Sequence, residues 1–155
     1  MTERWTVSRS GTALAAMIFL LPVVTMAEEH CPDPKVFKKQ GGVFTAPLVD
    51  QPGEWLGMLP RDSRGPIESF VEAEVAVDSP TGGAPRNVFR KCTYRLKGAG
   101  HVDVMYRPKS GNTTVTLPAG TSAWKPESSM IGMAYFVCTA SDPSACRFTG
   151  ASAIK

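Results

Sequence analysis

Residues 67–78, IESFVEAEVAVD, alternate between apolar and polar positions with a period of two. Four of the six even-numbered positions are acidic. This pattern predicts a strand with one buried and one solvent-facing side. A helix is the competing interpretation, because Ile67, Phe70 and Val71 also fit a 3.6-residue period. The β-branched valines favour the strand. The expected inward positions are Ile67, Ser69, Val71, Ala73, Val75 and Val77.

Residues 87–107 predict a hairpin, because two stretches of alternating apolar and polar residues flank a glycine-containing loop. Pairing must bring like faces together, and a three-residue loop over 98–100 does so. In this register Arg95 lies opposite Asp103 and forms a surface ion pair with it.

The remaining elements are short and are separated by prolines and glycines. Asp33 as a cap and Pro34 in the first turn predict one helix over 34–40. About eight strands and one short helix predict a mainly β fold, either an antiparallel sandwich or a small barrel. Further strands are expected at 41–49 (at an edge, because it contains a proline), 53–59, 113–117, 130–138 and 146–150.

The first 27 residues have the layout of a signal peptide. Arg4 and Arg9 precede an apolar run over 13–21, and Thr25-Met26-Ala27 supplies small residues before a cleavage site. The apolar run is too short for a membrane-spanning helix. Acidic residues and a histidine precede Cys31, which argues against a lipid anchor. We expect a single periplasmic or secreted domain over 28–155 with no membrane anchor.

The charge balance limits the partners. The chain has 17 basic and 14 acidic residues, and loss of the first 27 residues leaves a net charge near +2. So small an excess argues against nucleic acid as the main partner.

Four cysteines in an exported chain predict two disulfides. Cys138 and Cys146 flank a loop in the expected C-terminal hairpin, where they would lie opposite each other beside a Phe136–Phe148 pair. This leaves Cys31 to pair with Cys92. Metal and redox sites are disfavoured, because the sequence has no C-x-x-C and no closely spaced cysteine pair. No cofactor is expected.

Candidate binding residues are few. The loop between the last two cysteines contains Asp142-Pro143-Ser144, which predicts a type I turn that could present side chains to a partner. Trp55 and Trp124 are candidate binding aromatics, with core packing the favoured alternative.

No catalytic motif stands out. The two histidines, His30 and His101, have no patterned nucleophile or carboxylate nearby, and they are interpreted as surface residues. Three glutamates of the alternating strand, Glu68, Glu72 and Glu74, could act as paired acids of a glycosidase. A solvated strand face is the favoured interpretation.

Several short motifs resemble an uncharacterised family of small exported proteobacterial proteins. They are Cys31-Pro32-Asp33-Pro34, Gly42-Val43-Phe44, Gly53-Glu54-Trp55-Leu56-Gly57, and Phe89 with Cys92-Thr93-Tyr94. The resemblance implies a bacterial periplasmic or secreted protein and carries no functional residues.

Three functional hypotheses follow. The favoured one is a non-enzymatic, disulfide-stabilised domain that binds a protein partner, in the specific form of an inhibitor or immunity protein against a toxin or wall hydrolase. The second is an accessory or structural subunit of an envelope or secretion assembly. The third is a small hydrolase with an unrecognised site on the glutamate-bearing strand.

Overall fold

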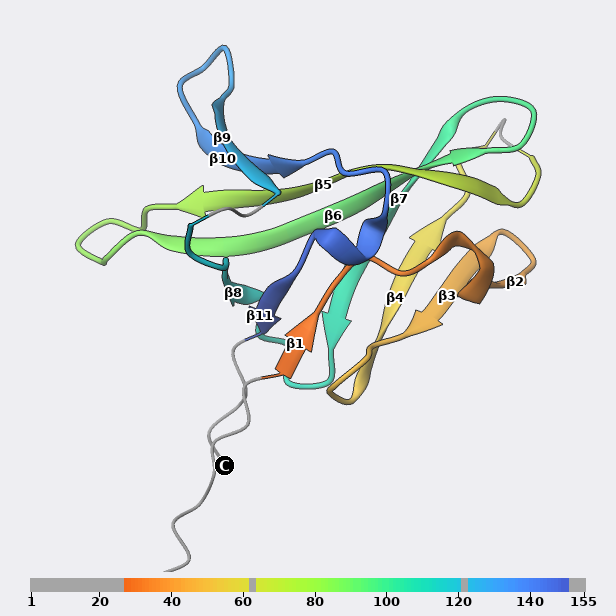
Figure 1. The fold of residues 1–155 in the computed structure, drawn as a ribbon, viewed down its shortest axis with the longest axis horizontal. Coiled ribbons are helices and arrows are strands. Elements are labelled where there is room, and N and C mark those ends of the chain that lie inside the picture. The colour runs from red at the N-terminus through yellow and green to blue at the C-terminus, as the bar shows by residue number, and fades with distance from the viewer. Residues whose placement is uncertain (1–26, 62–63, 121–122, 151–155) are drawn as a thin grey trace, which may run out of the picture.

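The computed structural model describes residues 27–61, 64–120 and 123–150 (Figure 1). The expected signal peptide lies outside the described residues except for Ala27, the first residue of β1. Two 3-10 turns, η1 (Pro34–Val36) and η2 (Pro143–Ala145), occur in the described residues, which otherwise form strands and loops. The strands are β1 (Ala27–Glu29), β2 (Lys38–Gln40), β3 (Val43–Pro47), β4 (Gly53–Met58), β5 (Ile67–Asp78), β6 (Arg86–Leu96), β7 (His101–Pro108), β8 (Thr114–Thr116), β9 (Trp124–Ser128), β10 (Ala134–Cys138) and β11 (Phe148–Gly150).

One antiparallel sheet contains all these strands, and it branches at β6. One edge of β6 pairs with β5, which continues to β10 and β9. The other edge is divided: 92–95 pair with β7, and 87–88 pair with β8. β7 leads on to β4, β3 and β2, and β8 leads on to β11 and β1. The sheet curls, and its end strands β1 and β2 do not pair with each other (Figure 1).

The core is an aromatic cluster inside this curl. Phe89 of β6 lies at its centre, with its ring 4.3 Å from that of Phe148 and 5.4 Å from that of Trp55. Tyr106 of β7 and Trp124 of β9 complete the contacts around Phe89. The side chains come from β6 and from all three branches that leave it, through β5, β7 and β8, so the cluster ties the branches together. The expected mainly β antiparallel fold is confirmed, in the form of a curled open sheet.

The helix expected over 34–40 is wrong. Asp33 does cap a turn, because its carboxylate accepts a 2.8 Å hydrogen bond from the Lys35 amide, but the turn ends after Val36. Phe37 then packs edge-on against Tyr94, with ring centroids 5.0 Å apart. This contact and the pairing of β2 with β3 draw the next residues into extended backbone. The pairing with β3 also makes β2 the outer strand of this branch. The expectation that the strand over 41–49 lies at an edge is therefore wrong.

The hairpin over 87–107 forms, but with a register two residues from the expected one. Arg95 lies opposite His101, and Thr93 lies opposite Asp103. A shift of two residues keeps each side chain on the expected face. The expected Arg95–Asp103 ion pair is therefore wrong: Asp103 binds Lys91 at 3.1 Å and accepts a 2.7 Å hydrogen bond from Thr93.

The strand over 67–78 is confirmed, with three register irregularities along its pairing with β6. The irregularity between Ile67 and Ser69 turns Phe70 inward, opposite Tyr94, and the irregularity between Phe70 and Glu72 returns the odd-numbered positions to the core side. Phe70, expected on the solvent side, consequently packs against Tyr94 with ring centroids 5.5 Å apart. Ala73 and Val75 are fully buried, as expected.

The expected C-terminal hairpin is wrong. β10 pairs with β5 and β9, whereas β11 pairs with β1 and β8, so these two strands lie in different branches of the sheet. The expected Phe136–Phe148 pair is wrong for the same reason. Phe136 lies opposite Val75, and Phe148 enters the aromatic core. The loop expected to precede 130 contains β9, which forms the real hairpin partner of β10.

The Gly53-Glu54-Trp55 motif has a packing explanation. Gly53 has a φ of +145°, and a Cβ there would lie 2.5 Å from the Arg107 carbonyl oxygen. Only glycine fits so close to β7. This close approach places Trp55 in the core.

Candidate functional site

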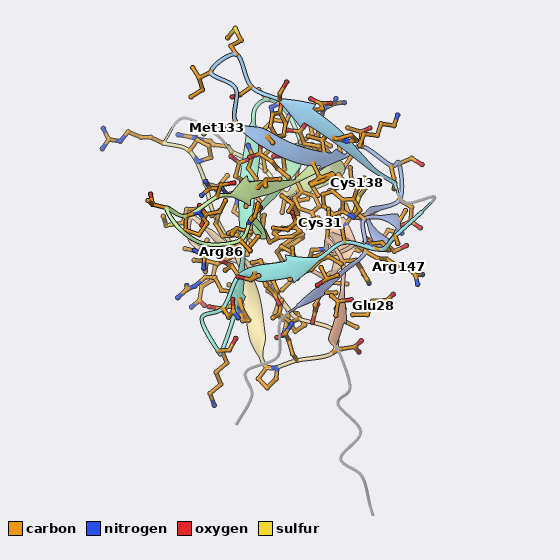
Figure 2. The ribbon with its side chains drawn as sticks, turned by 90° about the vertical axis from the view of Figure 1, so that its left-hand side faces the viewer. Glu28, Cys31, Arg86, Met133, Cys138 and Arg147 are labelled. Atoms are coloured by element: carbon orange, nitrogen blue, oxygen red, sulfur yellow. A yellow bond between two sulfur atoms is a disulfide. The ribbon has the colours of Figure 1, made fainter. Side chains whose placement is uncertain are left out.

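The hairpin of β9 and β10 carries exposed apolar side chains at its turn. Met130, Ile131 and Met133, here called the apolar tip, have relative exposures of 105%, 79% and 58%. The turn is closed by backbone hydrogen bonds of 2.9 Å from Ser129 to Met133 and from Gly132 to Ser129. Apolar side chains clustered in water are typical of interaction sites. Figure 1 shows this hairpin projecting from the sheet, and Figure 2 labels Met133 where the turn enters β10.

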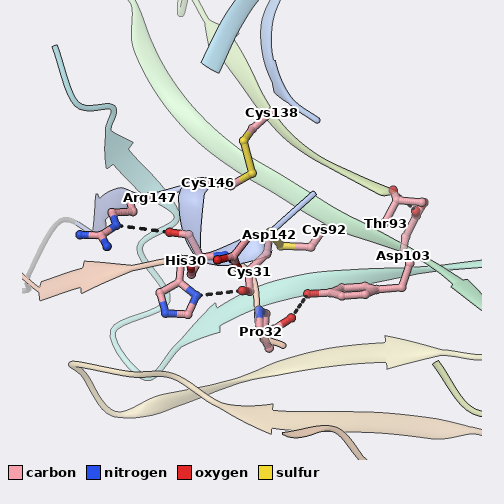
Figure 3. Close-up of a disulfide and its surroundings, with 12 residues drawn as sticks. His30, Cys31, Pro32, Cys92, Thr93, Asp103, Cys138, Asp142, Cys146 and Arg147 are labelled. Atoms are coloured by element: carbon pink, nitrogen blue, oxygen red, sulfur yellow. Dashed lines mark hydrogen bonds between the residues drawn. A yellow bond between two sulfur atoms is a disulfide. The ribbon is translucent and has the colours of Figure 1, made fainter. Parts of the chain in front are cut away.

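The base of the hairpin is held firmly. Cys138 ends β10 and is bonded to Cys146, which leads into β11 (Figure 3). Trp124 begins β9, is 5% exposed, and donates a 2.7 Å hydrogen bond from its indole nitrogen to the Arg147 carbonyl. The two contacts join the hairpin to the segment before β11 and fix the direction in which the apolar tip points.

A hollow of about 500 Å³ lies beside the apolar tip, over β5, β10 and β9. Four carboxylates line it, and Arg90 of β6 is the basic side chain in its lining. We call it the acidic groove. Its carboxylates belong to Glu72, Glu74, Asp78 and Glu127.

Tyr135 lies in the acidic groove, where neighbouring carboxylates affect its hydroxyl group. Its hydroxyl donates a 3.1 Å hydrogen bond to Glu127. This hydrogen bond is the main reason why the pKa of Tyr135 is raised, and partial desolvation and repulsion from Glu127, Glu74 and Glu72 add to it. The carboxylates therefore act together on the middle of the groove.

The expected turn at Asp142-Pro143-Ser144 forms but does not stand free. The Asp142 carboxylate accepts a 2.9 Å hydrogen bond from the Ser144 amide, which lowers the pKa of Asp142. Pro143 is buried. Asp142 and Pro143 line a second hollow of about 510 Å³, between η1 and the start of β5.

Trp55 and Trp124, the two candidate binding aromatics, are both buried, in agreement with the favoured interpretation that they pack in the core. Trp55 is 0% exposed and contacts three aromatic rings of the core. Both tryptophans belong to the core.

The disulfides join the expected cysteines. Cys31 is bonded to Cys92 across 61 residues, and Cys138 to Cys146 across 8. The first bond ties the N-terminal segment to the middle of β6. Beside it the Tyr94 hydroxyl donates a 2.7 Å hydrogen bond to the Pro32 carbonyl, drawn as a dashed line in Figure 3.

The three glutamates of β5 are not brought together. Glu72 and Glu74 line the acidic groove, whereas Glu68 lines the second hollow. His30 is half-buried and contacts the Cys31 carbonyl through Nδ1 at 2.8 Å, and His101 is exposed on β7. No cluster of three His, Cys, Asp or Glu side chains in the described ranges could hold a metal ion. Among these same residues, no helix is long and apolar enough to cross a membrane.

Two features escaped the sequence interpretation. The sequence predicts a strand through the apolar tip, although Gly132 within Met-Ile-Gly-Met is a signal for a turn. Glu29 is a fully buried carboxylate that accepts 3.0 Å hydrogen bonds from the Val49 and Asp50 amides. No local pattern indicated it, because its partners lie about 20 residues away.

The comparisons with known proteins give one match. The model of a family described as "Protein of unknown function (DUF3757)" matches residues 26–149. No curated protein and no solved structure matches the chain. The match agrees with the expected uncharacterised family, and it attaches no activity to any residue. By this match over most of its length, the chain belongs to the DUF3757 family.

Proposed function

We propose that this chain is an exported, non-enzymatic protein-binding domain that acts in the bacterial envelope or outside the cell. The observation that supports this proposal most is the apolar tip, because three large apolar side chains project into water from a braced hairpin. Leaving them exposed gives up burial free energy that a partner's surface would recover.

The construction of the hairpin suits recognition. Binding usually costs free energy because loops and side chains must be ordered, and a hairpin braced by Trp124 and the Cys138–Cys146 bond is already ordered. All four methionines of the described residues are exposed, two of them in the apolar tip. Methionine is flexible and polarisable, so it adapts to the shape of a partner's pocket.

Two disulfides in a domain of this size support export. Disulfides form and persist in oxidising compartments such as the periplasm and the extracellular space. Their presence agrees with the signal-peptide layout of the first 27 residues.

The specific form that we favour is an inhibitor or immunity protein against a toxin or wall hydrolase. A projecting hairpin with an apolar end can enter the cleft of an enzyme, and central apolar anchors carry most of the binding energy in such interfaces. An enzyme retained through the apolar tip would support this form. A component of an envelope or secretion assembly would instead support an accessory subunit.

The test compares two sets of variants in affinity purification from envelope extract. Met130→Ser/Ile131→Ser/Met133→Ser removes the apolar tip. The control, Met58→Ser/Met105→Ser, removes exposed methionines of β4 and β7. Circular dichroism and melting curves check that both variants fold.

The proposal predicts that wild type and the control retain the same protein and that the tip variant loses it. If the tip variant retains that protein as well as wild type does, the apolar tip is not the binding surface and the proposal fails.

A further inference from the structure

We propose that the acidic groove binds a basic, extended segment of the protein partner in which lysine or arginine side chains alternate with apolar ones. This inference rests on the proposed function and names the chemistry that the partner must supply. The apolar tip provides the anchor, and the acidic groove beside it selects among partners by charge.

The strand register places the groove's carboxylates on one face. Glu127 of β9 lies opposite Tyr135 of β10, and Glu74 of β5 lies opposite Val137 of β10. Glu72 precedes Glu74 by two residues on β5 and lines the same hollow. A segment that crosses these three strands therefore meets several carboxylates in succession.

These carboxylates are largely free of internal ion pairs. In the described part of the chain, Asp78 is the groove carboxylate that forms a salt bridge, to Arg86 at 2.8 Å. Glu72, Glu74 and Glu127 form none with the described basic residues, and Arg90 is the basic side chain in the lining. Lys125, opposite Val137, lies outside the lining. The lining thus keeps an excess of negative charge that a basic partner would complement.

The groove also has apolar surface. This surface would stay exposed to water if the ligand were a polar cation without apolar groups. Ala76, Val77, Val137 and Met133 line it, and Met133 belongs to the apolar tip. A volume of about 500 Å³ is in the range of ordinary ligand sites and accommodates a few side chains. Alternating basic and apolar side chains match both parts of this lining.

The segment is expected to lie across the face of the sheet. β9 is an end strand, but Pro126 removes a backbone donor from its middle, and Lys125 places a charge beside it. Proline and lysine on an outer strand oppose the addition of a further strand. Recognition therefore depends on side chains in the groove.

The experiment measures fluorescence anisotropy of three labelled heptapeptides with the purified protein. In the first peptide lysine alternates with leucine. The second replaces its lysines by glutamate, and the third replaces its leucines by serine. We expect the first to bind most tightly, and its affinity to fall as salt is raised, because exposed charges are screened.

Two matched variants test the position of the site. Glu72→Gln/Glu74→Gln removes two groove charges, and Glu54→Gln/Glu68→Gln removes two glutamates elsewhere on the protein. We expect the groove variant to bind the lysine–leucine peptide about tenfold more weakly, which is what the loss of two exposed charge pairs produces. The control should change the affinity by less than about twofold.

Three outcomes overturn the inference. The groove variant could bind the lysine–leucine peptide as tightly as wild type does, or the control variant could lose as much affinity as the groove variant. The third is that wild type binds the glutamate peptide as tightly as the lysine–leucine peptide. Sedimentation of wild type and of the groove variant tests whether the groove is instead occupied by a second copy of this chain. Self-association that the groove variant abolishes would make the occupant a second copy of this chain and overturn the proposal of a foreign partner.

The two proposals fail separately. If the groove variant still retains the partner that the tip variant loses, the groove inference fails and the protein-binding function stands. If no partner depends on the apolar tip but the lysine–leucine peptide depends on the groove charges, the proposed function fails.

Discussion

Glu29 shows how one side chain organises the N-terminal end of the domain. Its carboxylate is fully buried, and its two oxygens accept hydrogen bonds from successive amides at Val49 and Asp50. It therefore holds the turn that connects β3 to β4. Burial raises the pKa of Glu29 above its ordinary value of 4.5, although the two hydrogen bonds oppose the shift.

The raised pKa of Glu29 predicts a pH dependence of stability. Because the folded state binds the proton more tightly than the unfolded state, the stabilisation from protonation is complete below pH 4.5 and is lost as the pH rises through the folded-state pKa. The unfolding free energy of wild type minus that of Glu29→Gln should therefore fall as the pH rises from 4.5. Urea melts across this range measure it, and a difference that rises with pH would contradict the account.

Phe89 is the residue on which core packing depends most. It contacts Trp55, Tyr106, Trp124 and Phe148, which come from four different strands. Phe89→Ala should lower the unfolding free energy by about 3–5 kcal/mol, the range for a large buried aromatic side chain.

The half-buried Phe70 supplies the control for Phe89. It packs against Tyr94 at the margin of the core, so Phe70→Ala should cost less. Denaturant melts compare the two, and an equal cost would show that the aromatic cluster is not the centre of the core.

At the scale of elements, the two disulfides have different roles. The Cys31–Cys92 bond closes a loop of 61 residues, and the Cys138–Cys146 bond a loop of 8. Chain entropy assigns about 4 kcal/mol to the first and about 2.5 kcal/mol to the second. Cys31→Ser/Cys92→Ser should therefore destabilise the protein more than Cys138→Ser/Cys146→Ser, as measured in urea melts.

The shorter bond should matter more for the hairpin. Without it, hydrogen exchange at the amides of β9 and β10 should accelerate more than exchange in β7, because the bond fixes the base of β10. Equal acceleration in both regions would show that the bond has no local role.

The sequence predicted individual strands better than their partners. Period-two alternation located β5, β6 and β7, because each has one face against the core. The cysteine pairing was also correct, but the hairpin used to argue it does not exist. The bond joins two branches of the sheet, and its Cα atoms are 5.7 Å apart without any pairing of β10 with β11. Local patterns do not encode which strands meet across such distances.

The residues of the candidate site were also hard to predict from local sequence patterns. Trp55 and Trp124 stood out in the sequence and proved to be core residues. The apolar tip resembles a buried strand in the sequence, because a short apolar run fits both interpretations, and Gly132 is the residue in it that indicates a turn. The acidic groove is made of residues from β5, β9 and β10, whose adjacency follows from the sheet topology.

At the scale of the whole molecule, the scaffold is distinct from the proposed recognition surface. The aromatic cluster and the longer disulfide stabilise the curled sheet, while the braced hairpin carries the apolar tip away from it (Figure 1). This separation favours binding, because a contact surface that is already ordered loses less conformational entropy when a partner associates.

Site-specific photo-crosslinking shows which surface of the protein a partner contacts. A benzophenone amino acid would replace Ile131 in the apolar tip or, as the control, the exposed Met105 on β7, in protein produced in its own envelope. If the apolar tip binds a protein partner, illumination should give one defined protein adduct from the Ile131 position and none from the Met105 position. An adduct from the Met105 position alone, or the same adduct from both, would contradict this proposal.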